Sequence, residues 1–177
     1  MKKILLWVLF LGFLSSCSED IPPCENCQFT CIDEMDDEHI ITNDCRENWE
    51  CNFNVIPDSN VDIEEAGGVK RGDKTVFKLN SSTPGVDGIA DDQVTKNLIF
   101  ELDSNQKSFD AEGSLLKRMK VHYQTICFCA SIDFIEVSMG CMQGEGQADG
   151  SWMVQGSLEI PDSFGSFFVK FDAHFER

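Results

Sequence analysis

The chain has 177 residues, with 14 Lys+Arg against 31 Asp+Glu and a formal net charge of −17 at pH 7. This acidic excess argues against nucleic acid and against an anionic membrane surface as partners, because both are bound through basic patches. The length suits one folded domain with a core of its own.

The first segment of the chain has the features of a secretory signal peptide. Two lysines, Lys2 and Lys3, precede an unbroken apolar run from Ile4 to Leu14, and a cationic start followed by a short apolar stretch is typical of such a peptide. The run is shorter than the roughly 20 residues that a transmembrane helix needs. A signal peptide is therefore predicted in place of a membrane-spanning anchor.

The residues that end this run, Leu14-Ser15-Ser16-Cys17, resemble the lipobox of bacterial lipoproteins, in which a leucine and two small residues precede the lipidated cysteine. The resemblance implies that residues 1–16 are removed and that Cys17 is acylated. Several acyl chains anchor a protein stably where a single chain binds weakly. An ordinary signal peptide followed by a structural cysteine is the alternative. Cleavage would remove two lysines and no acidic residue, which leaves the mature chain more acidic still.

Residues 17–23 are predicted to form a lipidated tether, stiffened by two prolines. Ser18 after the cysteine is similar to the outer-membrane sorting pattern of Gram-negative lipoproteins. Ser18-Glu19-Asp20 is similar to the surface-export signal of lipoproteins in the Bacteroidota. These resemblances imply the cell outer membrane, at its periplasmic face or on the cell surface. A solvated acidic tether would contain the same residues.

Eight further cysteines predict a disulfide framework, because their number is even and the chain is expected to be exported. They are Cys24, Cys27, Cys31, Cys45, Cys51, Cys127, Cys129 and Cys141. The first five and the last three form two odd-numbered groups, so if all eight pair, at least one bridge joins the groups. That bridge would close a long loop and contribute about 4 kcal/mol in the chain-entropy model.

Two other aspects of these cysteines bear on their chemistry. Cys127 and Cys129 lie two apart on a predicted strand, where side chains share a face but stand too far apart to bridge, so each should pair elsewhere. Zinc binding and a C-x-x-C redox site at Cys24 and Cys27 are the alternatives. The expected export favours oxidation to disulfides.

The segment 24–51 is expected to be a small Cys-rich piece held by disulfides, and residues 52–177 a β domain. From residue 52 onward, apolar and polar residues alternate as in half-buried strands. The clearest runs are 133–142, 152–160 and 165–176, in which Ile135, Val137, Met139 and Cys141, then Trp152 to Ile160, then Phe167, Phe171 and Phe175 share a core face.

Further strands are predicted at 52–56, 60–66, 74–80, 97–103, 107–112 and 117–129, with a helical turn at 113–118. Asp149-Gly150 between alternating runs is a strong hairpin signal, and residues 161–165 make the next turn. The fold is therefore predicted to be all-β, an antiparallel β-sandwich or barrel of about nine strands.

Candidate sites for chemistry are few. The long connection 81–96 contains Asp87, Asp91 and Asp92, which could ligate calcium through carboxylate oxygens. An acidic surface loop is the ordinary alternative, and no other cofactor is expected. Residues 71–73 spell Arg-Gly-Asp, the tripeptide of integrin ligands, but Gly-Asp between predicted strands is ordinary turn chemistry.

Neither histidines nor hydroxyl groups form a catalytic motif. The three histidines, His39, His122 and His174, lie far apart in the sequence, and neither a metal motif nor a nucleophile elbow is present. Among the aromatic residues, Phe128, Phe134 and Phe168 fall on the phase opposite the predicted core face. They are candidates for an exposed binding patch, although packing between layers is the favoured interpretation.

These features together predict a lipid-anchored cell-envelope protein with a non-catalytic binding or structural role. Its expected partners are the membrane, through the N-terminal lipid, and an unidentified protein or glycan. Two alternatives remain open. One is a surface enzyme or enzyme accessory that acts on glycans or proteins, and the other is an inhibitor or immunity-type protein.

Overall fold

The computed structural model describes residue 21 and residues 40–85, 93–127, 133–162 and 165–177. Several residues singled out above lie outside these ranges: the lipidation candidate, the predicted calcium ligands, four of the cysteines, one histidine and one candidate aromatic, namely Cys17, Asp87, Asp91, Asp92, Cys24, Cys27, Cys31, Cys129, His39 and Phe128.

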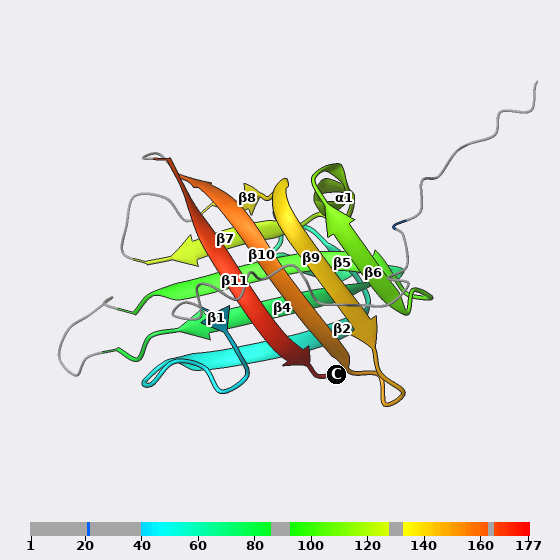
Figure 1. Ribbon diagram of the computed structural model, residues 1–177, viewed down its shortest axis with the longest axis horizontal. Coiled ribbons are helices and arrows are strands. Elements are labelled where there is room, and N and C mark those ends of the chain that lie inside the picture. The colour runs from blue at the N-terminus through cyan, green and yellow to red at the C-terminus, as the bar shows by residue number, and fades with distance from the viewer. Residues whose placement is uncertain (1–20, 22–39, 86–92, 128–132, 163–164) are drawn as a thin grey trace, which may run out of the picture.

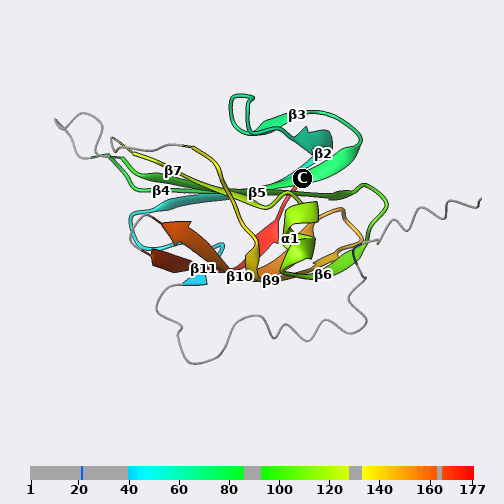
Figure 2. The same ribbon diagram turned by 90° about the horizontal axis from the view of Figure 1, so that it is seen from above.

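The described residues form two β-sheets that face each other (Figures 1 and 2). The five-stranded sheet has the order β1-β11-β10-β9-β6, with β1 at Ile40–Ile41, β6 at Ser108–Glu112, β9 at Met139–Gly146, β10 at Trp152–Asp162 and β11 at Gly165–Phe175. The six-stranded sheet has the order β3-β2-β4-β5-β7-β8, with β2 at Glu50–Val61, β3 at Val69–Arg71, β4 at Lys74–Ser82, β5 at Thr95–Asp103, β7 at His122–Ile126 and β8 at Ile135–Glu136. The predicted all-β fold is confirmed, in a sandwich-like arrangement.

Neighbouring strands are antiparallel, except that β1 runs parallel to β11. Two-residue alternation explains the core, because residues paired across the strands of one sheet share a face. In the six-stranded sheet one such inward row is Phe53, Leu79, Leu98 and Tyr123. All four are buried in the main core.

Aromatic rings fill the space between the sheets. The ring of Phe77 stacks on that of Phe100 at a centroid distance of 4.7 Å. The same ring meets Trp152 and Phe175 of the other sheet edge-on, at 5.2 and 5.8 Å. Edge-to-face pairs of this kind add to the stabilisation that comes from area burial alone.

One short helix, α1 at Ser114–Arg118, links β6 of one sheet to β7 of the other. It lies at one end of the sandwich (Figure 2). Leu116 and Met119 are fully buried in the main core. The helical turn predicted at 113–118 is confirmed, and its apolar residues close this end of the core.

The two sheets cross diagonally (Figure 1), and one corner is closed by hydrogen bonds between them. Past the end of β11, the backbone N–H of Glu176 donates to the carbonyl of Phe53 on β2 at 3.0 Å. The carbonyl of Glu176 accepts from the N–H of Val55 at 2.6 Å. The other end of β11 lies over β7, where the rings of Phe167 and Tyr123 are 5.7 Å apart. The start of β11 has therefore diverged from β2, and the diagonal crossing opens the sandwich there.

Three predicted strands are broken or substantially shortened in the structure. The run 60–66 is not one strand, because β2 continues to Val61 and the chain then turns before β3. Gly67 and Gly68 supply the positive φ angles of this turn, 82° and 76°. The run 117–129 is shortened to β7, since α1 extends to Arg118 and Lys120 has a φ of 48°.

The run predicted at 133–142 is divided between the two sheets, with β8 in one and β9 in the other. Gly140 has a φ of 107°, and a Cβ there would come within 2.2 Å of the carbonyl of Ser157. The alternation changes phase at this point, so Met139 is 46% exposed while Met142 is buried. The assignment of Met139 to the core face was wrong. Phe167 was also assigned to the core, but it lies at the open edge and is 37% exposed.

The cysteine framework is present in the described residues. Cys45 and Cys51 form a disulfide with a Cα–Cα distance of 5.8 Å, and Cys127 and Cys141 are also disulfide-bonded. Of the eight cysteines in the predicted framework, which leaves out Cys17, removing the Cys45–Cys51 pair leaves three before residue 32 and three after residue 126. Both groups stay odd, so a bridge between them remains a prediction, which peptide mapping under non-reducing conditions would test.

Candidate functional site

The aromatic residues predicted to form a binding patch are not brought together. Phe134 packs against Val61, Val76 and Ile99 on the outer face of the six-stranded sheet. Phe168 lies on β11 of the other sheet and is 62% exposed. The structure therefore separates these two members of the proposed patch.

The tripeptide at 71–73 forms the turn between β3 and β4, as its residues predicted. The side-chain oxygen of Asn60 accepts hydrogen bonds from the N–H groups of Asp73 and Lys74, each at 3.2 Å. A Cβ on Gly72 would come within 2.2 Å of the same asparagine. Close packing against Asn60 therefore accounts for a glycine at position 72.

The two described histidines lie in different sheets, His122 on β7 and His174 on β11. Within the described ranges, no three or more metal-ligating side chains gather at one place. In the same part of the chain, no helix has both the length and the apolar character required to traverse a bilayer.

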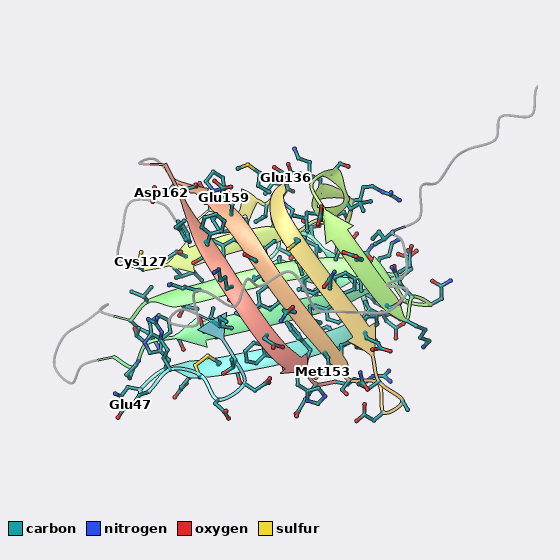
Figure 3. The ribbon with its side chains drawn as sticks, viewed as in Figure 1. Glu47, Cys127, Glu136, Met153, Glu159 and Asp162 are labelled. Atoms are coloured by element: carbon teal, nitrogen blue, oxygen red, sulfur yellow. A yellow bond between two sulfur atoms is a disulfide. The ribbon has the colours of Figure 1, made fainter. Side chains whose placement is uncertain are left out.

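A hollow lined by aromatic and basic residues lies where the diagonal crossing opens the sandwich, and we call it the end pocket. It has a volume of about 110 Å³, which is room for several water molecules. One wall comes from β1 and the connection to β2, and it includes the Cys45–Cys51 disulfide (Figure 3). The start of β11, residues 167–170, supplies the opposite wall. Ser81 of β4 and Lys96 of β5 also line it.

Strand register explains why polar side chains lie here. Next to the inward row of Phe53, Leu79 and Leu98 comes a row two residues nearer the strand ends. That row pairs Cys51 with Ser81 and Ser81 with Lys96. The inward face therefore changes from apolar to polar at the point where the core ends, and the end pocket forms there.

Lys96 is the cation nearest the interior of the end pocket. Its ammonium lies 5.3 Å from the centre of the Trp49 ring, a cation–π contact. Burial holds the pKa of Lys96 below its usual value, and the nearby charge of Arg46 lowers it further. Among the described residues, no carboxylate forms an ion pair with Lys96.

Ser81 is the most deeply buried polar residue in the lining, at 1% exposure. Its hydroxyl has no hydrogen-bond partner in the described part of the chain. Buried hydroxyl groups are normally bonded, so an exception calls for an explanation. Ser59 gives the contrast, because it is similarly buried and its hydroxyl donates to the carbonyl of Ile56.

The charge of the end pocket is opposite to that of the chain. Among the described residues, the lining contains Arg46, Lys96 and Lys170 but no aspartate, glutamate or histidine, whereas the chain as a whole carries a net charge of −17. Aromatic side chains, Trp49 and Phe168 among them, lie beside these cations. The described residues of the site offer hydrogen-bond donors and aromatic side chains.

Sequence reasoning identified Phe168 but missed the rest of the end pocket. A signal was present, because the inward phase of β4 runs Phe77, Leu79, Ser81 and that of β5 runs Phe100, Leu98, Lys96. A lysine at an inward position breaks the expected alternation. Such a break could have been noticed without the structure.

Comparisons with known proteins add no assignment to this geometry. No protein-family model, no curated protein and no solved structure gives a significant match to the chain. The function must therefore be argued from the site and from the N-terminal sequence.

Proposed function

We propose that the protein is a lipid-anchored cell-envelope protein with a non-catalytic binding role, and that the end pocket holds its ligand. The N-terminal residues support the anchor, since a charged start, a short apolar run and the lipobox-like residues follow one another without a gap. The composition of the end pocket suits a binding role, because the described residues of its lining combine hydrogen-bond donors with apolar and aromatic side chains.

The observation that carries the binding role is the hydroxyl of Ser81. A buried hydroxyl without a partner destabilises a fold by about 1–3 kcal/mol, and here it occurs at an open hollow beside a half-buried lysine. A ligand that enters the end pocket can bond this group and remove the penalty. Unsatisfied polar groups in a pocket are typical of sites that fix a ligand's orientation.

The anchor is tested by replacing Cys17 with serine. The wild-type protein should fractionate with membranes and incorporate labelled fatty acid, and Cys17→Ser should do neither, because the thiol that receives the lipid is gone. Ser18→Ala is the matched control and should behave as the wild type. Retention of both the label and the membrane association by Cys17→Ser would rule out lipidation at this residue.

The binding role is tested by nuclear magnetic resonance on the full-length chain in detergent, with its disulfides oxidised. The indole N–H signal of Trp49 reports on the end pocket, which this residue lines, and that of Trp152 reports on the core, where it is 8% exposed. A panel of neutral and charged monosaccharides, short glycans, short peptides and aromatic acids should contain compounds that shift the Trp49 signal alone. A panel that leaves this signal unchanged at 10 mM would contradict a ligand site there.

A further inference from the structure

Lys96 and Lys170 are the two lysines among the described residues that line the end pocket. Four other lysines, Lys70, Lys74, Lys117 and Lys120, each form an ion pair with a carboxylate. Within the described ranges, neither Lys96 nor Lys170 has a carboxylate partner. Lys78 and Lys107 also lack such a partner in these ranges, but they lie outside the end pocket. Lys96 differs because it is half-buried in the pocket beside the unpartnered hydroxyl of Ser81, which indicates that an external anion completes the site.

Burial makes the missing anion matter most at Lys96. Removing an ammonium from water disfavours its charged form, and a second cation nearby adds to the effect. Both conditions hold here, through burial and through Arg46. A bound anion would reverse both effects, so binding and retention of the lysine proton are coupled.

The strand register places a second donor beside the ammonium. Ser81 and Lys96 are directly paired across β4 and β5 and share the inward face. Side chains paired in this way have Cβ atoms about 5 Å apart. The Ser81 hydroxyl has no partner among the described residues. One carboxylate has two oxygens and can accept from both groups at once.

The residues that line the walls of the end pocket indicate what kind of molecule carries the anionic group. Trp49 and Phe167 line opposite walls of the end pocket, and Phe167 lies on the same face of β11 as the buried Val169 and Phe171. A hollow of about 110 Å³ is room for one ring and its substituents, by comparison with the volume that one water requires. Flat apolar faces pack well against aromatic rings and against the C–H face of a sugar ring.

We propose that the ligand of the end pocket is an organic carboxylate carried on a six-membered ring. Its carboxylate lies between Lys96 and Ser81, and its ring packs against Trp49 and Phe167. This inference rests on the proposed binding function. A sugar acid and an aromatic acid share this chemistry, and the experiment distinguishes them as sources.

The test uses two matched pairs of compounds, galacturonate with galactose and benzoate with benzyl alcohol, titrated against the Trp49 indole signal at pH 7 in 20 mM salt. At least one acid should bind at least tenfold more tightly than its neutral partner. The pair that shows the difference identifies the source as a sugar or as an aromatic compound. Raising the salt to 500 mM should weaken the acid and leave the neutral compound unchanged.

Three variants test whether Lys96 binds the carboxylate of the ligand. Lys96→Met should raise the dissociation constant of the acid at least tenfold, and Lys96→Arg should change it by less than about threefold. Lys107→Met makes the same change in net charge at an exposed lysine outside the end pocket and should have less than a twofold effect. Thermal unfolding of each variant verifies that it folds, and the salt titration of the wild type stands on its own if one does not.

The outcomes separate the two proposals. Equal affinity for acidic and neutral members of both pairs would overturn the anionic class and leave the binding function standing. No shift of the Trp49 signal by any of the four compounds at 10 mM would overturn the ring carboxylate, and the broader panel would then decide the binding function by itself. Tight acid binding that Lys96→Met leaves unchanged would refute the placement of the carboxylate.

Discussion

Replacing Ser81 with alanine should stabilise the protein, although serine-to-alanine changes at bonded buried sites destabilise. The hydroxyl is buried and has no partner among the described residues, so folding removes it from water without compensation. That penalty is about 1–3 kcal/mol, and loss of the oxygen's dispersion contacts offsets a few tenths of a kcal/mol. The expected net gain is about 1 kcal/mol, or an increase of about 2–4 °C in Tm for a chain of this size.

The matched control is Ser59→Ala. Ser59 is 3% exposed, and its hydroxyl donates to the carbonyl of Ile56. Removing a made hydrogen bond should lower the free energy of unfolding by about 1 kcal/mol. The two substitutions delete the same atom at similar burial. Changes of opposite sign in the free energy of unfolding would therefore show that the Ser59 hydroxyl is hydrogen-bonded and the Ser81 hydroxyl is not.

The assay is equilibrium unfolding in guanidinium chloride with the disulfides intact, followed by tryptophan fluorescence. Unchanged m values would show that the variants differ in stability and not in the surface exposed on unfolding. If Ser81→Ala lowers the free energy of unfolding as much as Ser59→Ala does, the Ser81 hydroxyl is bonded in the folded protein. The main support for a ligand site in the end pocket would then be lost.

Three other substitutions test separate parts of the structure. Because the pKa of Lys96 is lowered in the folded state, the unfolded chain binds more protons between that pKa and 10.5, so the free energy of unfolding of the wild type should rise with pH in this window. Lys96→Met should lose this rise in unfolding curves measured at pH 7 to 10. An equal dependence on pH in the two proteins would contradict the prediction. Joint replacement of Cys45 and Cys51 by alanine should lower the free energy of unfolding by about 2 kcal/mol in the chain-entropy model, since the bridge closes a loop with a sequence separation of 6. A loss of less than about 0.5 kcal/mol in a denaturant titration would be inconsistent with that model. Glu101 is buried and forms an ion pair with the more exposed Lys120 at 2.9 Å. Lys120→Met should therefore lower the free energy of unfolding more than Glu101→Gln does, because only the lysine variant leaves a buried charge unpaired. Chemical denaturation would show this order, and the reverse order would mean that the Glu101 carboxylate is solvated.

The long strands were predicted best from the sequence where one face is buried and the other is exposed to solvent. β10 and β11 alternate over their length and pair continuously from Trp152 with Phe175 to Asp162 with Gly165. Prediction failed where period-two alternation was too short or was interrupted. β3 has three residues and β8 has two, too few for a pattern to be read. Between Glu136 and Met139 the chain passes from one sheet to the other, and the phase of the alternation changes near Gly140.

The end pocket was harder to predict than the fold because it depends on pairing between distant segments. The polar residues Ser81 and Lys96 interrupt the apolar phase of their own strands, but only the register of β4 and β5 makes them neighbours. Phe168 was identified from its phase alone, but Trp49 belongs to a segment that was expected to stand apart as a Cys-rich piece. β1 and the first residues of β2 come from that segment and join the two sheets.

The parallel pairing of β1 with β11 also sets the order in which the chain can complete its structure. The side chain of Asn43 extends this pairing, since it donates to the carbonyl of His174 at 2.8 Å and accepts from its N–H at 2.6 Å, across 131 positions. Ribosomes synthesise a protein from its N-terminus, so β1 exists long before the strand that receives it. The two walls of the end pocket therefore meet only after the last strand has been made. Any chain that terminates before β11 lacks the pocket, even though nearly all of its other strands are present.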